Sequence, residues 1–157
     1  MNRLTHAPKP PVKTAAAGLT PKYGGFDGTS AAAVAARRNQ LSQLVGDAKT
    51  AADSVPVRIE ADCSMRVAEL TPLQTVALPL GPGRQAYLLC VEGAVAASDG
   101  NGGDASGARR LVRHDAAEVR GEGELRLTSG EEGAHVLLME MAAGGGGRAP
   151  GKWPLHM

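Results

Sequence analysis

Histidine, cysteine, serine and glutamate side chains are the groups in this 157-residue chain that could hold a metal ion or attack a substrate. In small β-barrels, imidazoles and carboxylates that point inward from neighbouring strands build such metal sites. The four histidines are scattered, and no His-x-His pair occurs: His6, His114, His135 and His156. His6 and His156 lie in the terminal segments, His114 lies in a turn, and His135 begins the last predicted strand. For His114 and His135 we expect a solvent-facing or hydrogen-bonded structural role rather than metal ligation.

The serines and cysteines form no recognisable nucleophilic site. No elbow motif surrounds the serines of the strand-rich region, which are Ser64, Ser98, Ser106 and Ser129. Neither Cys63 nor Cys90 has a general base nearby in the sequence. Two distant cysteines build neither a disulfide scaffold nor a zinc knuckle, so we expect both to be buried free thiols.

The acidic residues near the C-terminus and the glycine run also lack a catalytic pattern. Turn and solvated strand positions, rather than an acid/base pair, are expected for Glu122, Glu124, Glu131 and Glu132. The Gly-Gly-Gly-Gly run at 144–147 opens no helix and has no Lys-Ser or Lys-Thr pair, so it is not a phosphate loop. The sequence therefore predicts no catalytic, cofactor-binding or metal-binding residue in this chain.

Composition argues against polyanionic partners. Lys and Arg total 17 and Asp and Glu total 16, so the net charge of +1 provides no field to attract nucleic acid or an anionic membrane. No apolar run reaches the roughly 20 residues of a membrane span, and the N-terminus lacks the apolar centre of a secretory signal. We expect an intracellular protein, cytoplasmic or nuclear. Residues 1–26 lack acidic side chains, as transit peptides do, but their prolines and lack of serine favour a tail.

The hydrophobic pattern predicts an all-β domain. After Pro56 the apolar period becomes two, and strands are expected at 57–62, 65–70, 74–80, 85–93, 94–98, 109–115, 117–121, 124–129 and 135–141. A short helix is expected at about 30–38, capped by Thr29 or Ser30. Residues 39–45 fit either a continued helix or a strand, with propensity slightly favouring helix. About nine strands without helices between them indicate an antiparallel β-sandwich or barrel.

The turn-forming residues divide the chain into three parts. Residues 1–28 are rich in proline and glycine and are expected to be a linker or tail. Residues 29–142 form the one predicted domain, with a protruding loop at 98–108, and residues 143–157 are a predicted flexible tail.

Several segments resemble one known family. The stretch PLGPGRQAYLLCVEGAV at 79–95 resembles the C-terminal cupin of the pirin and quercetin 2,3-dioxygenase-like bicupins. Weaker matches to that barrel are RRNQLSQLVG (37–46), VRIEADCSMRVAEL (57–70) and AHVLLMEM (134–141), and TPKYGGFDG (20–28) is similar to the linker between the two cupins. The resemblance covers roughly 20–142, implies a jelly-roll cupin, and favours a strand over a helix at 39–45.

The resemblance also implies where metal ligands would lie. Cupins bind metal through His-x-His, a glutamate and a further histidine. Counting back from Gly93, the glutamate position falls at Ala86 and the paired histidines fall within 78–83, while the later motif at 114–127 has no histidine at its strand position. Glu60 replaces the histidine of the family's Ile-His-Gln-Asp strand. In the family the metal, such as iron, sits in the N-terminal cupin, which this chain does not contain.

Three functions follow as hypotheses. The first is a metal-free, non-catalytic cupin that packs against a metal-bearing N-terminal cupin half, or forms a homodimer. The second is a quercetin 2,3-dioxygenase-type enzyme in its own right. The third is a pirin-like transcription co-regulator that acts through protein contacts, which the near-neutral charge suits better than DNA binding.

Overall fold

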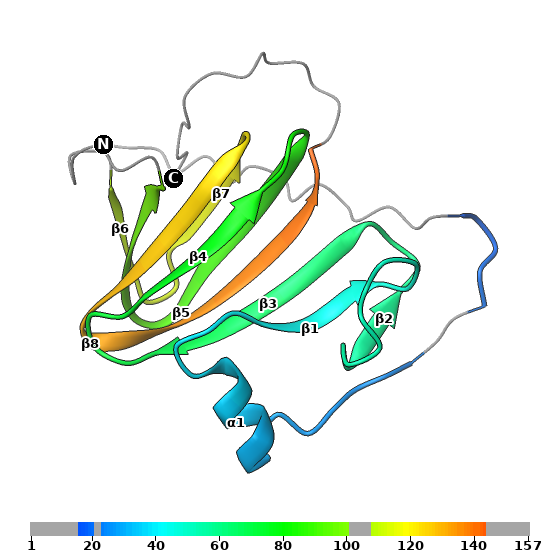
Figure 1. The fold of residues 1–157 in the computed structure, drawn as a ribbon, viewed down its shortest axis with the longest axis horizontal. Helices are drawn as coiled ribbons and strands as arrows, with labels where there is room; N and C mark the ends of the chain where they lie inside the picture. Colours follow the sequence, from blue (N-terminus) through cyan, green and yellow to red (C-terminus); the bar gives the residue numbers. More distant parts are fainter. Residues whose placement is uncertain (1–15, 21–22, 101–107, 144–157) are drawn as a thin grey trace.

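The computed structural model describes residues 16–20, 23–100 and 108–143 (Figure 1). One short helix precedes eight strands. The helix is α1 (Ala31–Arg37), and the strands are β1 (Ser42–Asp47), β2 (Val57–Ile59), β3 (Cys63–Leu70), β4 (Thr75–Leu80), β5 (Arg84–Asp99), β6 (Arg109–Val112), β7 (Ala116–Arg120) and β8 (Gly123–Ala142). The predicted all-β class is confirmed.

The eight strands form one sheet that folds over on itself. Its order is β2-β1-β3-β8-β5-β6, with β4 also paired to β8 and β7 also paired to β5. One layer contains β3, residues 134–142 of β8, residues 84–92 of β5, and β7. The other contains β4, residues 123–129 of β8, residues 95–99 of β5, and β6 (Figure 1). All pairings are antiparallel except β1 with β2, which is parallel and makes the sheet mixed.

Two predicted strand boundaries are wrong, because β5 and β8 each run through both layers. The sequence predicted separate strands at 85–93 and 94–98, and again at 124–129 and 135–141, but each pair is one continuous strand. Gly93 and Gly133 bend these strands with positive φ angles of 72° and 78°. A Cβ atom on Gly93 would lie 2.2 Å from the Gly133 carbonyl oxygen, so the two bends cross in close backbone contact.

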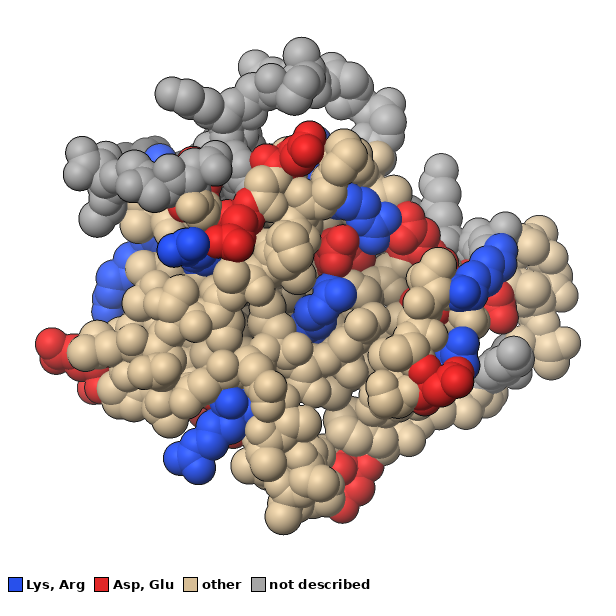
Figure 2. Space-filling model, in the orientation of Figure 1, with Lys and Arg blue, Asp and Glu red and all other residues tan. Residues whose placement is uncertain are grey.

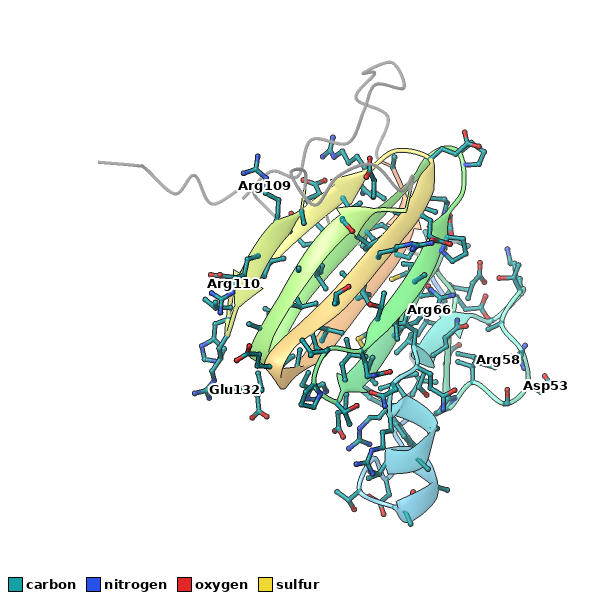
Figure 3. All side chains as sticks on the ribbon, turned by 60° about the vertical axis from the view of Figure 1, so that its left-hand side comes forward. Asp53, Arg58, Arg66, Arg109, Arg110 and Glu132 are labelled. Atoms are coloured by element: carbon teal, nitrogen blue, oxygen red, sulfur yellow. The ribbon has the colours of Figure 1, made fainter. Side chains whose placement is uncertain are left out.

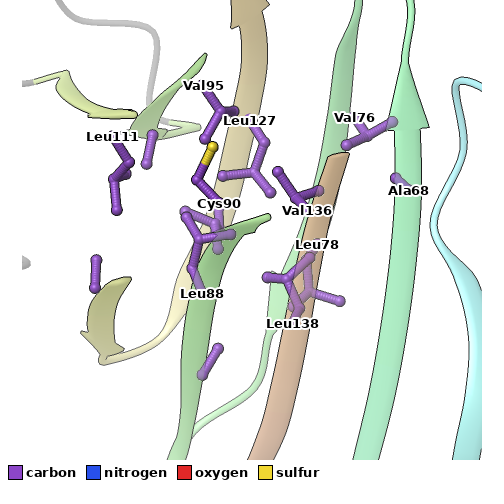
Figure 4. Packing of buried hydrophobic residues seen from close by; sticks show 14 of the residues in the cluster. Ala68, Val76, Leu78, Leu88, Cys90, Val95, Leu111, Leu127, Val136 and Leu138 are labelled. Carbon is purple, nitrogen blue, oxygen red and sulfur yellow. The ribbon is translucent and has the colours of Figure 1, made fainter. Parts of the chain in front are cut away.

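The core lies between the two layers and is aliphatic. Leu88 and Cys90 of β5, Val136 of β8, and Leu111 of β6 have no exposed surface (Figure 4). Alternate residues of strands β3 to β8 point into this core, with the period of two that is typical of strands with one buried face. Both cysteines are buried and unpaired, as predicted. Burial raises the pKa of the Cys90 thiol, and the negative charge of Asp115 adds to that effect.

The N-terminal helix is attached to the sheet through its last turn. The Ser30 hydroxyl caps α1 by accepting a hydrogen bond from the Ala33 amide at 3.2 Å, as expected. Arg37 donates to the Glu69 carboxylate on β3 at 2.7 Å and to the Gly28 carbonyl at 2.6 Å. The helix ends there, and residues 42–47 form β1, so the strand favoured by the resemblance is correct and the continued helix is wrong.

Several predictions concern parts of the chain outside the described residues. These parts are 1–15, 21–22, 101–107 and 144–157, and they include His6, His156, Ser106 and the four-glycine run. The predicted linker, protruding loop and C-terminal tail therefore stay predictions. In the described ranges, no helix is both long and apolar enough to cross a membrane.

Candidate functional site

A network of charged side chains lies where the inner face of the first layer reaches the end of the sandwich. Along β3, the inward positions change from apolar Ala68 to Arg66 and Ser64, and along β8 they change from Leu138 to Glu140. Along β5 they change from Ala86 to Arg84. Cross-strand register brings these residues together, because Ser64 and Ala86 both lie opposite Glu140.

Glu140 is the centre of this network. Its Oε2 atom accepts a hydrogen bond from Arg66 Nη1 at 2.8 Å and from Ser64 Oγ at 3.3 Å, while Oε1 accepts from Arg84 Nε at 3.1 Å. Arg66 Nη1 also donates to Ser64 Oγ at 2.7 Å. Arg84 Nη1 donates to both carboxylate oxygens of Asp62, at 2.7 and 2.6 Å. We call these five residues the arginine–carboxylate network.

Solvent is largely excluded from the middle of the network. The side chains of Glu140, Arg66 and Arg84 are 15%, 22% and 24% exposed, whereas Asp62 is 57% exposed. Burial alone would lower the pKa of the Arg84 guanidinium, but hydrogen bonds to Asp62 and Glu140 outweigh it and raise that pKa. Burial raises the pKa of the neighbouring Cys63 thiol, the charge of Asp62 adds to this, and Arg84 partly offsets it.

A small cavity of about 230 Å³ opens beside the network. The segment between β1 and β2 forms its other wall. This segment packs closely on Gly46 of β1, where an added Cβ atom would lie 2.5 Å from that of Ala51. The lining side chains are polar apart from two alanines and one cysteine: Gln43, Asp47, Thr50, Ala51, Ala52, Asp62, Cys63, Ser64, Arg66, Arg84 and Glu140. Figure 3 shows Arg66 on β3, with Arg58 and Asp53 further out.

The network is suited to holding strands β3, β5 and β8 together rather than to catalysis. Its central carboxylate is held by two guanidinium groups, so it is not free to act as a base. Over the described ranges, no group of three or more His, Cys, Asp or Glu side chains is arranged to hold a metal ion. On the visible face of the molecule, basic and acidic side chains are interspersed rather than gathered by sign (Figure 2).

The structure does not bring the two described histidines into a shared site with the network. His114 is exposed in the turn between β6 and β7, as the sequence predicted. His135 is half-buried within β8 rather than at its start, and it lies opposite Glu69 and Glu92. On β8, alternate residues point to opposite faces, which places His135 on the outer face.

Two of the three described serines, Ser64 and Ser129, make structural hydrogen bonds. Ser64 belongs to the network, and Ser98 lies half-buried on β5. Ser129 is 3% exposed and fastens the segment before β4, because its hydroxyl donates to the Thr71 carbonyl at 2.7 Å and accepts from the Gln74 amide at 3.0 Å.

The glutamates singled out from the sequence lie at solvated positions. Glu122, Glu131 and Glu132 are exposed. Glu124 accepts a hydrogen bond from Arg126 at 2.7 Å, and both of these side chains are exposed. None of them lies in the cavity lining.

Aliphatic side chains occupy the positions at which the resemblance placed metal ligands. Ala86 has no exposed surface, and Leu78 and Leu80, within 78–83, are 4% and 3% exposed in the core. The segment 114–127 supplies Ala117, Val119 and Leu125 to that core.

Sequence reasoning did not find the network, although a signal for it exists. Arg66, Arg84 and Glu140 each occupy the inward phase of a strand whose other inward residues are mostly apolar. A charged residue in that phase must be paired or reach solvent. Arg84 also lies in the segment that carries the resemblance most specifically, and Asp62 and Glu140 lie in two of its weaker segments.

Comparison with known families gives one match. The family described as the quercetinase C-terminal cupin domain matches residues 48–141, more than half of the chain. No curated protein matches the chain by sequence.

Comparison with solved structures finds proteins of the same fold. YhhW from Escherichia coli aligns with a TM-score of 0.59 at 15% identity, covering 79% of this chain and 44% of YhhW. YhaK from Escherichia coli aligns with a TM-score of 0.53 at 16% identity, covering 65% of this chain and 41% of YhaK. The chain thus spans less than half the length of these two proteins.

Proposed function

The chain belongs to the quercetinase C-terminal cupin family, and we propose that it is a metal-free, non-catalytic cupin that supports a second, metal-bearing cupin. The single observation that carries this proposal is the filled interior. The inward positions that ligands would occupy are aliphatic, and they are at most 4% exposed between the two layers. A close-packed aliphatic interior leaves no donor atoms for an ion such as iron.

The arginine–carboxylate network strengthens this proposal. Ala86, the expected glutamate position, lies directly opposite Glu140, whose carboxylate is already held by Arg66 and Arg84. Both carboxylates of the network, Glu140 and Asp62, are already paired with guanidinium groups, so neither has spare charge to offer a divalent cation. The network therefore ties β3, β5 and β8 together beside the cavity and leaves no free ligand there.

The outer face of the first layer is suited to packing against a partner barrel. Its central rows join Val67, Leu137 and Leu89, and then Met139 and Tyr87, across β3, β8 and β5. All are half-buried except Val67, which is 7% exposed. An apolar sheet face of this kind is typical of a protein–protein contact. We propose a second cupin as its occupant, because the matched family is a C-terminal domain and the chain spans less than half of YhhW and YhaK.

Two measurements test the two parts of this proposal. Elemental analysis of the purified chain, with oxygen uptake on quercetin, should show no stoichiometric iron, manganese or nickel and no turnover. Stoichiometric metal together with turnover would contradict the proposal and favour the quercetin 2,3-dioxygenase alternative.

Sedimentation velocity tests the packing surface. The isolated chain should self-associate as its concentration rises, and Leu137→Lys on the outer face should make it monomeric. The matched control is Leu73→Lys, which changes a side chain that is already 67% exposed. A wild-type chain that stays monomeric at high concentration would contradict the proposed surface.

A further inference from the structure

Four sulfur-containing side chains lie together on the outer face of β3 and β8. Cys63 is directly opposite Met141, and Met65 is directly opposite Met139. Directly opposed residues of an antiparallel pair lie on the same face, and so do residues two apart on one strand. All four side chains therefore project from one face as two adjacent rows, which we call the sulfur cluster.

The backbone spacing allows these sulfurs to reach a common point. Opposed Cβ atoms lie roughly 5 Å apart, and the two rows are separated by roughly 7 Å along the strands. A methionine Sδ atom lies two bonds beyond Cβ on a flexible side chain. An ion between the rows could thus be reached from all four positions by bonds of about 2.3 Å, a usual metal–thiolate length.

Burial within the cluster is graded. Cys63 and Met141 are 4% and 9% exposed, whereas Met65 and Met139 are half-buried. An ion could therefore enter between Met65 and Met139 and be held away from water by the inner row. The next side chains in the two rows are Val45 beside Met65, Tyr87 beside Met139, and Gln85 beside Met141. The Glu118 carboxylate lies one position beyond Tyr87 in its row, and Asp62 lines the polar cavity together with Cys63. The four sulfurs are therefore the donors directly around the space between the rows, and carboxylates lie only at its border.

Most of the sulfur-containing side chains of this sequence lie in the sulfur cluster. The sequence contains five methionines and two cysteines, and Met1 and Met157 are its first and last residues. Every internal methionine is therefore in the cluster, together with one of the two cysteines. The neighbouring outer-face row on the same strands has Val67 and Leu137 instead, so the apolar character of the face does not by itself require thioethers.

We propose that the sulfur cluster binds one soft monovalent metal ion, Cu(I). Thiolate and thioether ligands select Cu(I) over harder ions, which prefer oxygen or imidazole donors. The Cys63 thiol loses its proton to water as its sulfur bonds to copper, the three thioethers donate lone pairs, and copper stays in the +1 state. The site lies on the outer face of the sheet and shares Met139 with the packing surface proposed above. Its four sulfur donors are the same whether or not a second cupin covers that face, so the isolated chain is the form to test.

Anaerobic competition between the full chain and a colorimetric Cu(I) chelator tests this proposal. The wild-type chain should take up one Cu(I), with silver(I) competing and zinc(II) not. Met65→Leu/Met139→Leu keeps the apolar volume but removes two donors, and it should weaken binding at least tenfold. Cys90→Ala is the matched control, because it removes the other internal sulfur from the core and should leave binding unchanged.

Circular dichroism establishes that each variant is folded, and Cys63→Ser offers a second variant if the double variant is not. X-ray absorption of the copper-loaded chain should show sulfur scatterers alone. Failure of the wild type to compete for Cu(I), equal binding by wild type and double variant, or nitrogen and oxygen scatterers at copper would each overturn the proposal.

Discussion

Replacing Glu140 with glutamine should destabilise the protein far more than removing an exposed carboxylate of the same geometry. Glu140 accepts hydrogen bonds from Arg66 at 2.8 Å and Arg84 at 3.1 Å, and its side chain is 15% exposed. At an effective dielectric constant of 20, one such contact is worth about 6 kcal/mol before desolvation. Net hydrogen bonds to charged groups contribute about 1.5 to 3 kcal/mol each, and glutamine can replace only part of them. We expect a loss of about 2 to 3 kcal/mol.

Asp53 provides the matched control. Its carboxylate accepts from Arg58 Nη1 at 2.8 Å, the same distance as the Arg66–Glu140 contact, but its side chain is 99% exposed. Solvent screening makes such a pair nearly neutral, so Asp53→Asn should unfold like the wild type.

Urea denaturation at pH 7 measures both variants. With a slope of about 2 kcal/mol per molar urea, Glu140→Gln should lower the midpoint by about 1 M. If the two variants unfolded at the same urea concentration, the network would not stabilise the fold and the reasoning would be refuted.

Three further predictions concern the backbone and a thiol. Gly93→Ala should lower the free energy of unfolding by about 3 to 5 kcal/mol, because its Cβ atom would meet the Gly133 carbonyl oxygen. Gly83→Ala, at a similar φ but with open space around it, should lower the free energy of unfolding by only about 1 kcal/mol. Equal losses of the two variants in urea unfolding would contradict this. Leu73 is 67% exposed and has a φ of 61°, a left-handed conformation that is strained for leucine but not for glycine. Leu73→Gly should therefore raise the free energy of unfolding by about 0.5 kcal/mol. A lower free energy of unfolding would show that the conformation is not strained. Burial raises the pKa of the Cys90 thiol in the folded protein above its ordinary 9.0, so the thiol stabilises the fold below pH 9 and this stabilisation is lost as the pH rises further. The free energy of unfolding should therefore fall more steeply above pH 9 in the wild type than in Cys90→Ala. Equal slopes of the free energy against pH in the two proteins would exclude this effect.

The period-two pattern after Pro56, together with the turn residues, was sufficient to predict the all-β class. It did not assign an inward face to the apolar runs at 86–91 and 136–139, where Leu88, Val136 and Leu138 are buried and their apolar neighbours lie on the other face. Gly93, by contrast, looked like the end of a strand. A glycine that bends a continuous strand and one that ends it have the same local sequence, and only the crossing with Gly133 distinguishes them.

The candidate site was harder to predict than the core. Asp62, Arg84 and Glu140 are far apart in the sequence, and their contacts depend on which strands pair with which and in what register. Sequence alternation identifies the inward phase of Arg84 but not its partners. The same holds for the sulfur cluster, whose four members become neighbours only through the pairing of β3 with β8.

Anomalous diffraction from crystals grown with added iron, manganese or nickel tests the central claim most directly. The filled aliphatic interior predicts no anomalous peak between the two layers beside Ala86, where cupin ligands would converge. A strong peak at that position from a fully occupied metal ion, coordinated by side chains of this chain, would contradict the supporting role. It would show that the domain binds metal itself.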